Sequence, residues 1–212
     1  MSFRIPARLA TIVLAGVLIL PVAAPAQQAV TDITALQKER RQLLEATRLA
    51  DALPVAQRIA DLSDGLSVPQ QIGAYFDLAS LRREAGDLDG AVLAYGEVIT
   101  RAGTPDRASM YLGMVYDNLA MIRRAQEQWD AAETASDRAL EIFQRTVGVR
   151  DMHYGAALNN RAVILGDQDK FVLALDYSER ALNILREALK DDAAALAPFL
   201  KDNRWIRDQL PR

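Results

Sequence analysis

The sequence predicts an all-α fold assembled from repeated helical hairpins. Ala and Leu, which favour the helix strongly, supply 36 and 28 of the 212 residues. Half of the residues are apolar, so the chain can bury a core and is not disordered over most of its length. Two separate segments recur after 41 and 42 residues, which indicates a repeat architecture.

Residues 1–26 are expected to form a secretory signal peptide. Arg4 and Arg8 give a cationic start, the run from Leu9 to Leu20 is almost wholly apolar, and Ala24-Pro25-Ala26 offers an A-x-A cleavage site. The apolar run is shorter than the roughly 20 residues that span a bilayer, so an uncleaved anchor is the less favoured alternative. Cleavage would remove two arginines and change the formal net charge from −3 to −5. We therefore expect an exported, periplasmic protein without stable membrane insertion.

Residues 27–70 are predicted to form an N-terminal helical hairpin, a degenerate repeat. Leu and Ile recur at helical spacing over residues 32–66. Pro54 suits the first turn of a helix that begins after Asp51. The stretch from Ser63 to Pro69 is interpreted as the loop that follows this hairpin.

Residues 71–190 are predicted to contain three repeats of two helices each. The segment from Leu78 to Arg83 recurs from Leu119 to Arg124, and the segment from Ser136 to Ile142 recurs from Ser178 to Ile184. Polar turns divide the units at Gly86-Asp87, Glu127-Gln128 and Gly166 to Asp169, and second helices are expected from Asp89, Trp129 and Phe171. Small residues hold equivalent places: Ala79, Ala120, Ala162, then Ala91, Ala132, Ala174, then Val98, Ala139, Ala181. They would let neighbouring helices approach closely.

Residues 191–212 are predicted to form a C-terminal capping helix, running from Pro198 to Leu210. A capping element is needed because the last repeat would otherwise expose its core face. Asp191 and Asp192 are interpreted as N-cap residues of the following helix, since helix N-termini favour a negative charge.

The repeated pattern resembles the tetratricopeptide repeat, in particular the longer variant of kinesin light chain. The resemblance rests on Asp117-Asn118-Leu119-Ala120 followed by Trp129, on Leu158-Asn159-Asn160-Arg161-Ala162, and on the approach from His153 to Leu158. It implies a right-handed α-solenoid whose first helices line a concave groove. The chain departs from the family pattern in having Ala for the usual Gly of the first helix and Arg161 for a packing Leu. A HEAT-like helical repeat is the structural alternative.

Composition and motifs exclude most kinds of catalytic site. The chain has no cysteine and one histidine, so thiolate zinc sites, cysteine nucleophiles and sites with several histidines are excluded. No phosphate-binding glycine loop or nucleophile elbow occurs. The net charge of −3 does not show the basic excess that is typical of proteins that bind nucleic acid. His153 is interpreted as a structural or exposed residue in a loop between repeats. We expect no cofactor, no metal and no enzyme; a hydrolase with paired carboxylates is the remote alternative.

A ladder of polar residues is the candidate functional feature. Asp77, Asn118 and Asn160 hold the same place in successive first helices. In the family that the chain resembles, an Asn at this place hydrogen-bonds the backbone of a bound peptide, because an amide both donates and accepts. The other predicted groove residues are Phe76, Ser80, Arg83, Asp117, Met121, Arg124 and Asn159. The alternative is that these polar residues simply occupy exposed helix surface.

These observations predict a scaffold for protein–protein interaction that holds a polypeptide partner in its concave groove. Asn118 and Asn160 would hold the partner backbone, while Arg83 and Arg124 would contact its acidic groups. The alternative function is a structural component of a cell-envelope assembly that associates with copies of itself as a homo-oligomer.

Overall fold

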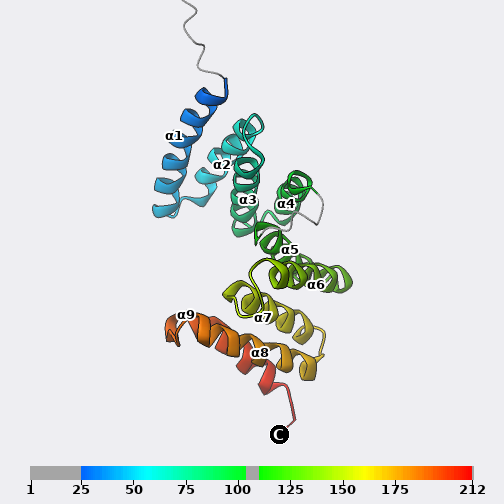
Figure 1. Ribbon diagram of the computed structural model, residues 1–212. Coiled ribbons are helices and arrows are strands. Elements are labelled where there is room, and N and C mark those ends of the chain that lie inside the picture. Colours follow the sequence, from blue (N-terminus) through cyan, green and yellow to red (C-terminus); the bar gives the residue numbers. More distant parts are fainter. Residues whose placement is uncertain (1–24, 104–109, 212) are drawn as a thin grey trace, which may run out of the picture.

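The structure of the protein is a computed structural model that describes residues 25–103 and 110–211 (Figure 1). The predicted signal peptide lies outside these residues, except for Pro25 and Ala26, which begin the first helix. The described residues form nine helices and no strand: α1 Pro25–Glu45, α2 Leu49–Ser63, α3 Val68–Glu84, α4 Leu88–Ala102, α5 Met110–Ala125, α6 Trp129–Thr146, α7 Met152–Gly166, α8 Phe171–Ala188 and α9 Ala193–Asp208. None of these helices combines the length and apolarity that a bilayer crossing requires.

The helices pack as four consecutive hairpins and a final helix, so the chain is an all-α repeat solenoid. Each first helix packs on its partner, α1 on α2, α3 on α4, α5 on α6 and α7 on α8, and α9 packs on α7 and α8. First helices also contact one another, α3 with α5 and α5 with α7. The stack curves, with α1 and α9 on the side opposite α4 and α6 (Figure 1). We call the surface that α1, α3, α5, α7 and α9 share the first-helix face.

The small residues predicted from the repeat form the seam of the hairpins. All nine of them are fully buried, namely Ala79, Ala91, Val98, Ala120, Ala132, Ala139, Ala162, Ala174 and Ala181. Gly113 of α5 serves the same purpose, because a Cβ there would lie 2.6 Å from the buried ring of Phe143. The prediction of close helix approach at these positions is therefore confirmed, and it explains the abundance of alanine.

The capping helix begins earlier than predicted. The structure places its start at Ala193, five residues before Pro198, because Asp192 caps the helix. The Asp192 carboxylate accepts hydrogen bonds from the backbone N–H groups of Ala194 (2.9 Å) and Ala195 (3.2 Å). This cap and the alanine-rich first turn outweigh the interruption by Pro198, which lies inside α9. The N-cap prediction for Asp192 agrees with this geometry.

Two boundaries near the N-terminus also differ from the sequence-based expectation. Helix α2 begins at Leu49, so Pro54 lies inside the helix rather than in its first turn. Helix α3 begins at Val68, so the predicted loop is shorter, and residue 70, the predicted boundary of the hairpin, lies in the first turn of α3. Ser67 and Gln70 form a capping box there, which fixes the start of the helix ahead of Pro69.

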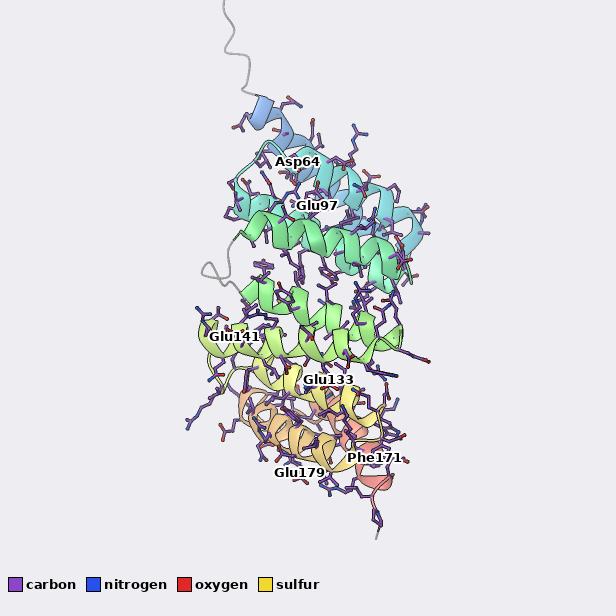
Figure 2. All side chains as sticks on the ribbon, turned by 90° about the vertical axis from the view of Figure 1, so that its right-hand side faces the viewer. Asp64, Glu97, Glu133, Glu141, Phe171 and Glu179 are labelled. Carbon is purple, nitrogen blue, oxygen red and sulfur yellow. The ribbon has the colours of Figure 1, made fainter. Side chains whose placement is uncertain are left out.

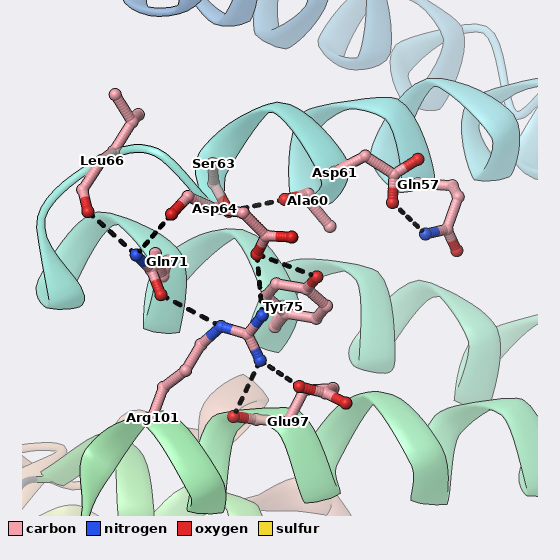
Figure 3. A network of polar contacts seen from close by, with 10 residues as sticks. All are labelled: Gln57, Ala60, Asp61, Ser63, Asp64, Leu66, Gln71, Tyr75, Glu97 and Arg101. Carbon is pink, nitrogen blue, oxygen red and sulfur yellow. Dashed lines mark hydrogen bonds and ion pairs between the residues drawn. The ribbon is translucent and has the colours of Figure 1, made fainter. Parts of the chain in front are cut away.

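A network around Arg101 joins the first two hairpins (Figure 3). The guanidinium of Arg101 in α4 lies over the ring of Tyr75 in α3, 3.9 Å from its centroid. It pairs with Asp64 after α2 at 2.7 Å and with Glu97, and it donates to Oε1 of Gln71 at 3.1 Å. One partly buried cation therefore bonds groups from α3, α4 and the loop after α2.

Arg161 is accommodated in the third repeat by a buried ion pair. Its side chain is only 10% exposed, and Nη2 lies 2.8 Å from Oε2 of Glu133 in α6. Nη1 donates to the backbone oxygen of Glu133 at 3.0 Å, and Lys170 before α8 holds the other carboxylate oxygen at 2.8 Å. Burial opposes ionisation of Glu133, but Lys170 and Arg161 outweigh it, and the pKa of this carboxyl is lowered.

Candidate functional site

The predicted groove residues come from α3, α5 and α7, which lie in succession on the first-helix face. Because α3 contacts α5 and α5 contacts α7, the fold brings the three members of the polar ladder onto one surface. Their equivalent places follow from the repeat, so Asp77, Asn118 and Asn160 each occupy the middle of a first helix. The structure then distinguishes between them by the contacts that each one makes.

Asn160 is bonded within the protein. Its Nδ2 donates to Oδ2 of Asp117 at 2.9 Å, which links α7 to α5. One N–H of this amide is therefore already used between repeats, so Asn160 has less capacity left to bond a peptide backbone. Asn160 accordingly contributes to the packing of the first helices.

Asn159 lies in the interface between α7 and α9. The residue is 2% exposed, and its Nδ2 donates to Oδ2 of Asp202 at 2.7 Å. Its Oδ1 is buried without a hydrogen-bond partner among the described residues. This position holds the capping helix on the stack rather than presenting an amide to solvent.

Asp77 is partly engaged and partly accessible. Its carboxylate pairs with Arg40 of α1 at 2.8 Å, and 46% of the side chain is exposed. Asn118 is half-buried and makes no hydrogen bond to the described residues. Of the three ladder residues, Asn118 is therefore the one whose side chain has no bond to the described residues, so its whole amide can serve donors and acceptors of a partner.

The carboxylate of Asp117 is the acidic group on this face whose pKa is most affected by its surroundings. Although the residue as a whole is half-buried, its Oδ1 is enclosed and lacks a hydrogen-bond partner among the described residues. Burial raises the pKa of the Asp117 carboxyl to about 6, while the Asn160 amide and the charges of Arg83 and His153 act in the opposite direction. The enclosed Nε of Arg83 likewise has no partner among the described residues. The site therefore contains buried polar atoms that are incompletely satisfied.

Aromatic side chains lie beside these polar groups. The ring of Phe76 meets those of Tyr95 and Tyr111 edge-on, at centroid distances of 5.9 and 5.6 Å. The hydroxyl groups of Ser80 and Tyr95 lie 3.3 Å apart. Tyr111 of α5 is exposed, so this cluster reaches the surface.

The remaining predicted residues have structural contacts. Arg124 pairs with Asp167 at 2.6 Å, which links the ends of α5 and α7. Met121 packs against Ala120, Ala132 and Ile164. Arg124 is therefore already neutralised, and Met121 belongs at least in part to the core.

A hollow of about 310 Å³ opens between α1 and α3 on the first-helix face. We call it the first-helix hollow; its lining includes Val30, Ile33, Thr34, Gln37, Gly73, Ala74, Asp77 and Tyr111. Sequence reasoning identified only Asp77 among these residues. Gly73 and Tyr111 were missed because the hollow forms between helices of different hairpins, and no local pattern marks such a space.

His153 lies at the start of α7 rather than in a loop. Asp151 caps this helix and accepts from the backbone N–H of His153, and the same oxygen lies 2.8 Å from the Nδ1 atom of the ring. The ring also packs near Phe143, with centroids 5.9 Å apart. These contacts agree with a structural role. Among the described residues, no group of three or more potential metal ligands is present.

Comparison with known proteins supports the repeat architecture. Residues 106–196 match the tetratricopeptide repeat family. No curated protein matches the sequence significantly. The structure is similar to that of BtubC (BKLC) from P. vanneervenii, with 20% identity, a TM-score of 0.56, and coverage of 88% of this chain and 89% of that one.

Two further solved structures have the same arrangement of helices. The nearly identical TPR-like repeats of a putative kinesin light chain from Podosopora anserina give a TM-score of 0.58 at 14% identity, covering 89% of this chain and 98% of that one. MamA from residue 41 to its end, from Desulfovibrio magneticus RS-1, gives a TM-score of 0.55 at 11% identity, covering 85% and 98%. At these identities the similarity concerns the fold alone.

Proposed function

We propose that this all-α repeat solenoid, with its tetratricopeptide-repeat segment, is a non-enzymatic scaffold that binds a polypeptide on the first-helix face. The observation that carries the proposal is the first-helix hollow, which lies beside Asp77 and the exposed ring of Tyr111. The available amide of Asn118 lies on the next first helix along the same face. An elongated surface with apolar, aromatic and amide groups suits a polypeptide.

The proposed mechanism is capture on a preformed surface. Contacts between first helices, such as Arg40 with Asp77 and Asn160 with Asp117, fix the curvature of the face before a partner arrives. Asn118 then bonds the partner main chain through an amide that both donates and accepts, and an apolar partner side chain enters the first-helix hollow. Because little ordering of the scaffold is needed, less binding free energy is lost on association.

We also propose that the protein is exported from the cytoplasm. The layout of residues 1–26 supports a secreted, periplasmic protein, and the partner would then be another exported or envelope polypeptide. The alternative is that the protein associates with copies of itself as a structural component of a cell-envelope complex.

Two substitutions on the first-helix face are expected to weaken capture of the partner. Gly73→Leu fills the first-helix hollow, and a Cβ at this position meets no atom within 4 Å, so the fold accommodates it. Asn118→Ala removes the available amide without leaving a protein group unpaired. We expect each variant to retain about a tenth or less of the partner in pull-down from native extracts, with an unchanged melting temperature.

The controls make closely matched changes on α8, away from the first-helix face. Ala188→Leu adds a leucine at an exposed position, and Asn183→Ala replaces an exposed asparagine. Both should capture the partner as the unaltered protein does. Full capture by Gly73→Leu and Asn118→Ala would contradict binding on the first-helix face.

A further inference from the structure

A second groove lies away from the first-helix face, between the second helices α4 and α6. Its main part has a volume of about 480 Å³ and a largely apolar lining from Val92, Gly96 and Ile99 of α4, Tyr116 and Leu119 of α5, and Ala135 of α6. An adjoining hollow of about 160 Å³ shares Ile99, Tyr116 and Arg138 with it. We call the two together the α4–α6 groove. Figure 2 views the molecule from this side, with Glu97 of α4 above Glu133 and Glu141 of α6.

The corresponding space between α2 and α4 is crossed by polar contacts. The guanidinium of Arg82 in α3 donates to Oε1 of Gln57 in α2 at 2.7 Å and to the backbone oxygen of Gly90 in α4 at 2.9 Å. At the other end of these helices, Arg101 of α4 reaches Asp64 after α2. Second helices α2 and α4 are therefore tied together across the repeat boundary.

The corresponding space between α6 and α8 is crossed as well. Glu133 of α6 is held by Arg161 of α7 and by Lys170, the residue before α8, each at 2.8 Å. This buried network occupies the space that would otherwise separate the two helices.

The α4–α6 groove is open because apolar or small residues occupy the positions that carry the bridging polar side chains at the α2–α4 and α6–α8 boundaries. Val92 is equivalent to Glu133, Leu119 to Arg161, and Gly96 to Gln57. Across this boundary the described residues show one polar contact, from Nε2 of Gln126 to Oδ1 of Asp89 at 3.4 Å, and it lies at one end. The groove is thus a specific departure from its two neighbours in the same chain.

The shape of the groove suits a helical segment. Its α6 side is formed by residues at helical spacing along one face, at positions 131, 134, 135, 138, 142 and 145. Fifteen residues of helix extend about 22 Å, or four turns. A small molecule is normally enclosed on most of its surface, whereas a long open channel fits an amphipathic helix laid between two others.

The edges of the groove carry an excess of cations. Arg138 and Arg145 share one carboxylate, Glu141, at 2.9 and 3.6 Å. Within residues 25–103 and 110–211, Arg123 hydrogen-bonds only the neutral side-chain amides of Gln126 and Gln128. Asp130 is the other acid in the lining, so three guanidinium groups face two carboxylates. Acidic residues beside an apolar stripe would complement this arrangement.

We propose that the α4–α6 groove is a second docking site, which receives an acidic amphipathic helix of about four turns from a partner protein. Apolar side chains on one face of that helix enter between Val92, Gly96 and Leu119. Aspartate or glutamate beside them pairs with Arg123 and Arg138. The site is independent of the first-helix face, so the scaffold holds two polypeptides at once.

The test is selection of a phage-displayed library of random 16-residue peptides on the immobilised protein, followed by fluorescence anisotropy of the enriched peptides. We expect one class with apolar residues at i, i+3 or i+4 and i+7, flanked by Asp or Glu. Gly96→Leu, which meets no atom within 4 Å at its Cβ, should weaken binding of this class at least tenfold. Arg123→Glu combined with Arg138→Glu should weaken it similarly.

Gly73→Leu is the matched control, because it fills the first-helix hollow and leaves the α4–α6 groove unchanged. Peptides of the acidic class should bind this variant normally. The proposal is overturned if no acidic amphipathic class is enriched, or if its binding is unaffected by Gly96→Leu. Enriched peptides sensitive only to Gly73→Leu would support the first-helix face and contradict the second site.

Discussion

Replacing Arg161 with alanine is expected to lower the free energy of unfolding by about 3 kcal/mol. The side chain is 10% exposed and bonds both the carboxylate and the backbone oxygen of Glu133. Without the guanidinium, these acceptors remain enclosed and a cavity is left between α6 and α7. Lys170 still holds one carboxylate oxygen, so the loss falls at the lower end of what breaking a buried pair causes.

The measurement is urea unfolding followed by circular dichroism, with two comparison variants. Arg161→Leu places an apolar side chain where Leu78 and Leu119 stand in the other repeats; it fills the cavity but leaves the same acceptors unpaired, so we expect a loss about 1 kcal/mol smaller than that of Arg161→Ala. Arg180→Ala removes an arginine whose pairing with Asp176 is exposed, and it should change stability by less than about 0.5 kcal/mol. An effect of Arg161→Ala as small as that of Arg180→Ala would contradict the buried bridge.

Asp117→Asn is expected to stabilise the protein at pH 7.5 by up to about 3 kcal/mol. Burial raises the pKa of this carboxyl to about 6 in the folded state, against about 3.9 for an aspartate in an unfolded chain. Between these values the folded state binds more protons, so the contribution of Asp117 to stability grows as the pH falls. The neutral amide of an asparagine avoids the enclosed charge while still meeting the amide of Asn160.

The pH profile distinguishes this explanation from general stabilisation. The advantage of Asp117→Asn over the unaltered protein should shrink as the pH falls from 7.5 to 4, because the carboxyl becomes protonated. Asp176→Asn, a change at an exposed position, should give no such trend. A constant advantage, or one that grows in acid, would show that Asp117 is not held as an enclosed carboxylate.

The architecture could be predicted because each repeat is marked by short sequence patterns that recur along the chain. Ala91, Ala132 and Ala174 recur at a fixed interval, and close helix approach needs a small residue at each. The bounds of α6 follow from the polar turn before Trp129 and the end of the periodic pattern at Thr146. Helix α9 was placed too late because a proline was taken as its start, whereas the carboxylate of Asp192 caps it earlier.

The candidate site could be predicted only in part. The repeat places Asp77, Asn118 and Asn160 on one face, but it does not show which side chains bond one another. Asn160 reaches Asp117 across 43 positions of sequence, and Asn159 reaches Asp202 across the same interval. Such pairings depend on the exact offset between neighbouring helices, which no pattern within one helix encodes.

The spaces between repeats were the least predictable features. The first-helix hollow is lined by Gly73 and Tyr111, which come from different hairpins. The α4–α6 groove is open because the described residues do not form there the arginine bridges found at the two neighbouring boundaries. Both are defined by the three-dimensional positions of side chains from different hairpins. In the third repeat Arg161 fills the space that is open beside its equivalent, Leu119.

Binding on the first-helix face is tested most directly by site-specific photocrosslinking in the native cell. The photoreactive residue p-benzoylphenylalanine replaces the aromatic ring of Tyr111, which is 43% exposed beside the first-helix hollow, in one variant and Val172, which is 74% exposed on α8, in another. Position 111 is predicted to give one defined crosslinked polypeptide that disappears when Asn118→Ala is added, while position 172 gives none. The same product from both positions, or a product at 111 that persists with Asn118→Ala, would contradict the proposed function.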